Sequence, residues 1–259
     1  MKKVAIKALP RLKHNTKESL NTLCTNISLA PGSIKKILIT SCRPKEGKSF
    51  ITINLMRAMA SIGKKVVMVD ADLRVSMLAS RYGIQPEDPK NFIGLAQYLY
   101  EDHSIDEIIY KTNYSCADFI PAGGRTINSL PLLNNPKLKE LLDALAEKYD
   151  IVLVDAPPIG VIIDAAEIAK DCDGVLMVVE NNKIGCTELK TAMDQLRMTG
   201  CEILGAVLNK VSFKTKSAKK YYYRTYYSHY NSYSSYYHRS NWSKTKGEKL
   251  KKTDRKKGK

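Results

Sequence analysis

The chain has 259 residues, 44% of them hydrophobic, which is enough for a sizeable core in one or two domains. Six cysteines without a C-x-x-C pair argue against a zinc site and against a secreted disulfide framework. The net charge of +16 is concentrated in residues 214–259, which hold 15 basic and 2 acidic residues, so the rest of the chain is nearly balanced.

The sequence lacks the usual marks of export or membrane insertion. The basic N-terminus is not followed by the apolar region of a signal peptide. No apolar run approaches the ~20 residues that a transmembrane helix needs. We therefore expect a cytoplasmic protein, recruited to a membrane only through a partner or its C-terminal segment.

Short β-branched runs alternate with helical patterns along the chain. The pattern predicts strands at residues 36–41, 65–70, 117–121, 150–155, 174–179 and 203–209, and helices at residues 48–62, 137–148 and 187–198. The strand segments are continuously apolar, as is typical of parallel strands covered on both faces. The repeated β-α-β order predicts an α/β fold with a doubly wound, mostly parallel sheet that binds ligands at the carboxyl ends of its strands.

A phosphate-binding loop is predicted between the first strand and the first of these helices. The segment S-C-R-P-K-E-G-K-S spans residues 41–49. Gly47 permits close backbone approach, Lys48 can reach the β- and γ-phosphates, and the Ser49 hydroxyl can bind Mg²⁺. The first glycine of the usual motif is replaced by Cys42, for which a small buried thiol is the favoured interpretation.

Acidic residues follow two further strands. Asp70 and Asp72 lie in the segment V-V-M-V-D-A-D-L-R, and Asp155 lies in I-V-L-V-D-A-P-P. A single aspartate of this kind is more often a helix cap or a loop residue. Three of them beside a phosphate loop indicate a Mg²⁺ site in the crevice at the carboxyl edge of the sheet.

These three motifs together resemble those of the bacterial tyrosine kinases of capsular and exopolysaccharide biosynthesis, which are P-loop NTPases similar in fold to the ParA/MinD ATPases. The resemblance covers about residues 18–211. It implies ATP and Mg²⁺ as cofactors, a transferred phosphate stabilised by Lys48, and metal organised by Ser49, Asp70, Asp72 and Asp155. Either Asp70 or Asp72 would accept the proton of the tyrosine hydroxyl. Nucleotide would be bound by Arg43, Pro44, Lys45, Glu46, Gly47, Lys48, Ser49 and Phe50, with Asn209 near adenine.

The sequence departs from the family at two places. The E-x-x-R-x-x-R helix that supports ring assembly in the family retains Glu18, but Asn21 and Cys24 replace its arginines. Losing two bidentate donors predicts a weaker homo-oligomer. After Arg74 the usual proline and histidine are absent.

The C-terminal segment is rich in tyrosine, lysine and arginine, and its composition predicts disorder. The tyrosine cluster has three interpretations. Its rings could stack on the bases of a single-stranded nucleic acid, the segment could be a solvated low-complexity tail, or the tyrosines could accept phosphate. Beside a kinase-like site we favour acceptance and consider nucleic acid unsupported. The expected acceptors are Tyr221, Tyr222, Tyr223, Tyr226, Tyr227, Tyr230, Tyr233, Tyr236 and Tyr237.

The predicted organisation is an N-terminal helical segment at 1–35, a P-loop tyrosine-kinase domain at 36–213 and a disordered tail at 214–259. The resemblance implies a transmembrane polysaccharide co-polymerase as activator, a tyrosine phosphatase that resets the tail, and peripheral membrane contact. The alternative is a ParA/MinD-like positioning ATPase whose basic tail binds membrane or DNA. Such ATPases usually carry lysine at the position of Arg43 and lack a tyrosine cluster. A non-catalytic scaffold would leave the motif residues idle.

Overall fold

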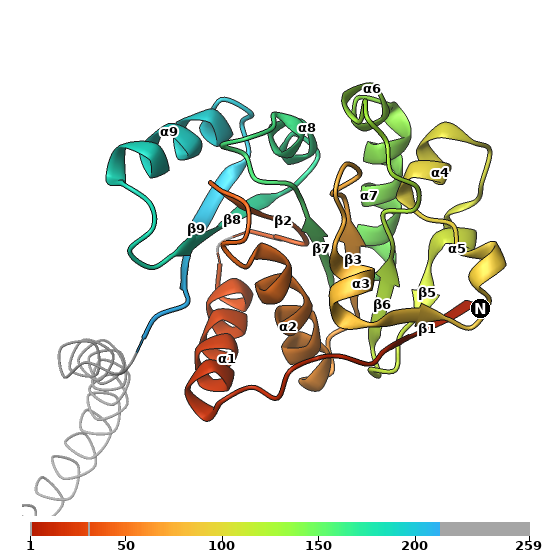
Figure 1. Ribbon diagram of the computed structural model, residues 1–259, viewed down its shortest axis with the longest axis horizontal. Coiled ribbons are helices and arrows are strands. Elements are labelled where there is room, and N and C mark those ends of the chain that lie inside the picture. Colours follow the sequence, from red (N-terminus) through yellow and green to blue (C-terminus); the bar gives the residue numbers. More distant parts are fainter. Residues whose placement is uncertain (1, 31, 213–259) are drawn as a thin grey trace, which may run out of the picture. The chain divides into compact units, whose positions relative to one another are not determined.

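The computed structural model describes residues 2–30 and 32–212 (Figure 1). Its strands are β1 Lys2–Ile6, β2 Lys36–Ser41, β3 Val66–Asp70, β4 Ile84–Pro86, β5 Tyr110–Lys111, β6 Ala117–Ile120, β7 Ile151–Asp155, β8 Gly174–Glu180 and β9 Glu202–Asn209. Its helices are α1 His14–Ser28, α2 Lys48–Ser61, α3 Leu78–Tyr82, α4 Leu95–Tyr100, α5 Ile105–Ile108, α6 Leu130–Leu133, α7 Pro136–Lys148, α8 Asp164–Ala169 and α9 Cys186–Arg197, with a 3₁₀ turn η1 at Pro89–Asn91.

The strands form one sheet in the order β4-β1-β5-β6-β3-β7-β2-β8-β9. From β6 to β9 in that order every neighbouring pair is parallel. Antiparallel pairing occurs only toward the other edge of the described sheet, between β5 and β6 and between β1 and β4. The predicted doubly wound α/β fold is therefore confirmed.

Alternate residues of the central strands enter two separate hydrophobic clusters. In β2, Leu38 packs with α7, α8 and α9, whereas Ile37 and Ile39 pack with α1 and α2. The same alternation holds in β3, β7 and β8. Because both faces are covered, these strands are apolar along most of their length, with Lys36 at the start of β2 as an exception. The polar residues Thr40, Ser41, Asp70 and Asp155 lie at the carboxyl ends of β2, β3 and β7.

Helix α7 shows how local sequence sets an element. Asn135 caps it by accepting a hydrogen bond from the Lys137 amide, and Pro136 occupies its first turn. Leu138, Leu141, Leu142 and Leu145 then recur at helical spacing and are fully buried. The predicted start at residue 137 differs from the observed start by one residue.

The N-terminal segment corrects one expectation. Residues 1–35 were expected to be helical, but α1 is preceded by strand β1, which pairs with β4 and β5. Val4 and Ile6 are buried while their neighbours are partly exposed, so this short strand has the alternating pattern of a half-covered sheet. The expected kinase domain thus shares its sheet with the first residues of the chain.

Candidate active site

The motif residues meet at the carboxyl edge of the central strands. Strand β7 lies between β3 and β2, and Asp70 is in register with Asp155 at the strand ends. The phosphate loop leaves β2 beside them and enters α2 at Lys48. The switch-point geometry expected from the β-α-β order therefore places the lysine and the carboxylates in one crevice.

The phosphate loop has a tight backbone that depends on glycine. Lys45 and Gly47 both have positive φ, 68° and 100°. A Cβ at Gly47 would lie 2.1 Å from the Asn209 amide nitrogen. Backbone turns of this kind direct successive N–H groups toward one point, which makes an anion-binding concavity at the start of α2. The loop therefore fits a phosphate group.

Glu46 fixes this loop from inside. Its carboxylate accepts hydrogen bonds from the Arg43 amide at 2.8 Å and from the Glu180 amide, at the end of β8, at 3.2 Å. Its carbonyl accepts a hydrogen bond from the Asn209 side chain at 2.8 Å. The loop is thus tied to the ends of β8 and β9. Asn209, which is predicted to lie near adenine, is thus found beside the phosphate loop.

Lys48 occupies the centre of an acidic cluster. Its Nζ lies 3.2 Å from Oδ2 of Asp72 and 3.7 Å from Oδ2 of Asp155. Burial alone would lower the pKa of Lys48, but the charges of Asp155, Asp72 and Asp70 outweigh burial and raise it above the ordinary value. The side chain therefore stays cationic and available for a phosphate.

Asp70 is almost completely buried and is held by two donors. The Asp72 amide donates to its Oδ1 at 3.3 Å, and the Ser76 hydroxyl donates to its Oδ2. Burial and the neighbouring charge of Asp155 raise the pKa of Asp70 to about 8. Burial also raises the pKa of Asp155, although Lys48 opposes this. A cation close to Asp70 and Asp155 would therefore favour the ionised form of both carboxyl groups.

The donor set fits a nucleotide with Mg²⁺. Oδ1 of Asp155 accepts a hydrogen bond from Thr52 at 3.1 Å, whereas its buried Oδ2, 3.7 Å from Lys48 Nζ, has no hydrogen-bond partner among the described residues. A buried carboxylate oxygen in that state is suited to a cation. Within residues 2–30 and 32–212, no group of three or more His, Cys, Asp and Glu side chains forms a complete metal site. Mg²⁺ commonly uses one or two carboxylates together with substrate phosphates, so this arrangement is compatible with it.

Other predicted residues of the phosphate loop make different contacts. Arg43 is half-exposed, and its guanidinium donates two hydrogen bonds of 2.6 Å to Glu188 on α9. Pro44 is exposed, and the Phe50 side chain packs against the cluster under α1 and α2. Burial raises the pKa of the Cys42 thiol to about 11, which agrees with a buried, protonated side chain.

Sequence reasoning missed several polar groups that support the site. Thr52 lies one helical turn after Lys48, a spacing that could have identified it as a partner of the same carboxylates. Ser76 and Asp164 carry no motif signal, and only the folded loops bring them to Asp70 and Arg74. The nine predicted acceptor tyrosines lie outside the described residues.

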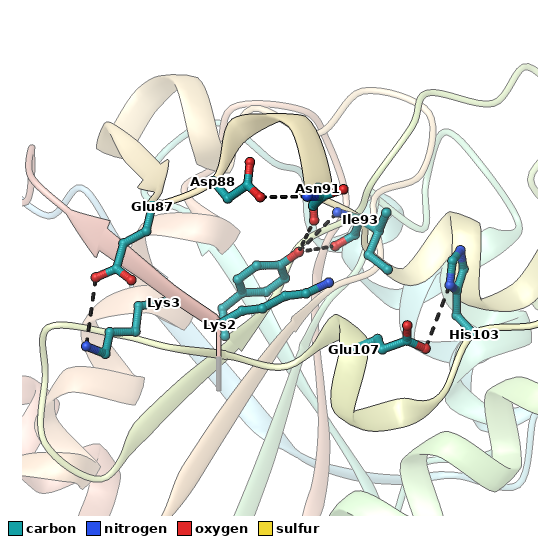
Figure 2. A pocket seen from close by; sticks show the side chains of 9 residues that line it. Lys2, Lys3, Glu87, Asp88, Asn91, Ile93, His103 and Glu107 are labelled. Atoms are coloured by element: carbon teal, nitrogen blue, oxygen red, sulfur yellow. Dashed lines mark hydrogen bonds and ion pairs between the residues drawn. The ribbon is translucent and has the colours of Figure 1, made fainter.

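A cavity of about 420 Å³ lies beside β1 (Figure 2). Some of its polar side chains contact one another: Lys3 lies 3.9 Å from Glu87, and a ring nitrogen of His103 lies 3.8 Å from the Glu107 carboxylate. The Tyr110 hydroxyl is hydrogen-bonded to the backbone of Ile93. None of the residues that line this cavity belongs to the phosphate loop. It is lined by Lys2, Lys3, Glu87, Asp88, Asn91, Ile93, His103, Glu107 and Tyr110.

None of the described helices has both the length and the apolar character that a membrane span requires.

Comparison with known proteins agrees with the geometry. A family described as an AAA domain matches residues 34–201. A curated relative, tyrosine-protein kinase CpsD of Streptococcus agalactiae serotype Ia, is 33% identical over 78% of this chain and 85% of its own length. The solved kinase domain of the Escherichia coli tyrosine kinase ETK matches with TM-score 0.73 and 27% identity, covering 81% of this chain and 83% of that one.

A septum site-determining protein MinD of Pyrococcus horikoshii, solved as a complex with Mg-ADP, is similar at a greater distance. Its TM-score is 0.58 at 28% identity, with 72% of this chain and 76% of that chain covered. The ParA/MinD-like alternative is therefore the less supported of the two.

Proposed function

The chain belongs to the bacterial tyrosine-protein kinases, and from this membership we propose that it phosphorylates the tyrosine cluster in its own C-terminal segment. The observation that carries the proposal is the position of Lys48 at the start of α2, within 3.2 Å of Asp72 and 3.7 Å of Asp155. Phosphoryl transfer depends mainly on positioning and on charge compensation, and this arrangement supplies both.

In the proposed reaction the tyrosine oxygen forms a bond to the γ-phosphorus of ATP. The bond from that phosphorus to the bridging oxygen breaks, and ADP leaves with its electron pair. The proton of the tyrosine hydroxyl passes to Asp70 or Asp72. Lys48 and the backbone amides of the phosphate loop from Lys45 to Ser49 compensate the charge on the phosphate oxygens. Bound Mg²⁺ would supply further charge compensation, with Ser49 and one or two carboxylates from Asp70, Asp72 and Asp155 as its protein ligands.

Replacing Lys48 with methionine tests the proposal. We expect Lys48→Met to abolish tail phosphorylation, because the cation at the phosphate position is lost while the apolar stem is kept. The neighbouring carboxyls can take up protons, so circular dichroism should still report a folded domain. The control is Lys64→Met, at an exposed lysine after α2. Tyrosine phosphorylation of the Lys48→Met protein, detected by mass spectrometry with labelled ATP, contradicts the assignment.

The same assay separates the kinase from a positioning ATPase. A ParA/MinD-like protein would release ADP without forming phosphotyrosine, whereas the proposed kinase forms both. The nine tyrosines clustered at 221–237 support the kinase, since a tail that only binds membrane or DNA does not require them.

The proposal extends to a partner at the membrane and to polysaccharide synthesis. The family resemblance supports a transmembrane co-polymerase as the activator, a phosphatase that reverses the modification, and control of capsular or exopolysaccharide export. Co-expression with such a membrane protein should raise tail phosphorylation, and deletion of its cytoplasmic segment should remove the increase.

The structure of α1 bears on homo-oligomer formation. Asn21 is exposed and lies 3.5 Å from the Glu18 carboxylate, but Cys24 is buried in the cluster with α2. We therefore propose that the unphosphorylated protein alone assembles only weakly at micromolar concentration. Light scattering is the test, and a stable closed oligomer would show that contacts outside α1 are sufficient.

A further inference from the structure

Arg74 joins three loops at the carboxyl edge of the sheet. Its Nε and Nη2 donate to the two carboxylate oxygens of Asp164 at 2.9 and 3.2 Å, and its Nη1 donates to the carbonyl of Ile127 at 3.1 Å. Asp164 is buried and also accepts from the Ser129 hydroxyl. The loops that follow β3, β6 and β7 are therefore fixed to one another beside the crevice.

These three loops expose apolar side chains to solvent beside the Lys48 site. Their exposed fractions range from 49% to 96%, and Ile127 is the most exposed. The loop after β7 reaches the phosphate loop itself, because a Cβ at Gly160 would lie 2.4 Å from the Cys42 carbonyl oxygen. Exposed apolar residues concentrated beside a functional site indicate a binding surface. We call this set, Val75, Met77, Ile127, Val161 and Ile163, the apolar rim.

We propose that the apolar rim receives the aromatic ring of an acceptor tyrosine from residues 221–237 of this chain or of a second copy, an inference that rests on the proposed kinase function. The segment has nine tyrosines and no aspartate or glutamate in 17 residues, so its side chains match an apolar surface above an acidic floor. A tyrosine can pack its ring on aliphatic groups while its hydroxyl remains in a polar crevice. The rim therefore selects tyrosine and orients it.

The length of the chain permits this occupant. Asn209, the last residue of β9, contacts the phosphate loop through Glu46. Tyr221 follows it by twelve positions, which span at most about 40 Å when fully extended. The acceptor segment is therefore attached near the site at a high local concentration.

The test uses full-length protein with Ile127→Asp, alone and combined with Val161→Asp. Because the Ile127 side chain is exposed and Arg74 is hydrogen-bonded to the backbone carbonyl, the fold should persist. We expect the initial rate of tail phosphorylation to fall at least tenfold, while the Kd for a non-hydrolysable ATP analogue with Mg²⁺ stays within twofold. Ile127→Phe should retain the wild-type rate, because it remains apolar. The matched control is Met198→Asp, at a side chain 88% exposed beyond α9.

Two results would contradict the proposed role of the apolar rim. A wild-type rate for the double variant overturns it, and so does an equal loss of ATP-analogue affinity, because the rim would then belong to the nucleotide site. Failure of the proposed function looks different: wild-type protein would form no phosphotyrosine at all. A separate experiment mixes catalytically active protein with full-length Lys48→Met protein, which serves only as acceptor. Phosphorylation of the Lys48→Met protein shows that the bound tyrosine can come from a second copy and not only from the same chain.

Discussion

Replacing Glu46 with glutamine should measure how strongly the phosphate loop is fixed. The buried carboxylate accepts from two backbone amides, those of Arg43 and Glu180. Glutamine keeps one acceptor oxygen and turns an NH₂ group toward the other amide. A hydrogen bond to a charged group contributes ~1.5–3 kcal/mol, and an unsatisfied buried donor costs ~1–3 kcal/mol. We expect Glu46→Gln to lower the free energy of unfolding by about 2–3 kcal/mol.

Urea denaturation of the nucleotide-free, full-length protein measures this change, with an unchanged slope against denaturant. In thermal unfolding, about 2–4 °C per kcal/mol for a domain of this size gives a fall of about 4–12 °C. The control Glu188→Gln weakens only the exposed pair with Arg43 and should cost less than ~1 kcal/mol. If Glu46→Gln unfolds at the wild-type midpoint, the carboxylate does not hold the loop and the reasoning is wrong.

Three further outcomes are expected. Gly47→Ala should weaken ATP binding by tenfold or more, because the new Cβ would lie 2.1 Å from the Asn209 side-chain amide. The control Gly63→Ala should leave ATP binding unchanged, since a Cβ there meets no described atom within 4 Å, and an Asn209→Ala background should restore part of the affinity that Gly47→Ala loses. The pKa of Asp70 is raised to about 8, so between pH 4 and 8 this carboxyl is protonated in the folded protein but ionised in the unfolded chain. The metal-free protein should therefore lose stability as the pH rises from 4 to 8, by at most ~1.4 kcal/mol per pH unit. Asp70→Asn should make the midpoint of urea unfolding less dependent on pH. Residues 214–259 carry a net charge of +13, and each phosphotyrosine adds about −1.5 to −2, so phosphorylated protein should co-sediment less with anionic vesicles at low salt; equal binding of both forms contradicts an electrostatic release.

The sequence predicted the central fold well because the central strands are apolar on both faces. Strand β2 begins and ends where expected, and the helices α2, α7 and α9 agree to within one residue at each end. The phosphate loop was predicted because its chemistry requires a fixed spacing of Gly47, Lys48 and Ser49 next to a strand end.

The edge of the sheet was harder to predict. Strands β4 and β5 have three and two residues and owe their existence to pairing with β1 and β6, which no local pattern reveals. The polar contacts that hold the site residues in place could not be predicted for the same reason. The contacts of Asp164 with Arg74 and of Glu46 with Glu180 join residues 90 and 134 positions apart, so only tertiary structure brings them together.

The crowding of three carboxylates around Lys48 has a consequence for the lifetime of the protein. In the described part of the chain, Lys48 lies among three buried aspartates, and Oδ2 of Asp155 has no hydrogen-bond partner. A ligand that supplies a divalent cation relieves this repulsion and adds RT ln(1 + [L]/Kd) to the stability, or ~2.7 kcal/mol at a hundredfold excess over Kd. Resistance to proteolysis should therefore follow the supply of Mg²⁺ and ATP, so that a cell depleted of energy would clear this enzyme faster.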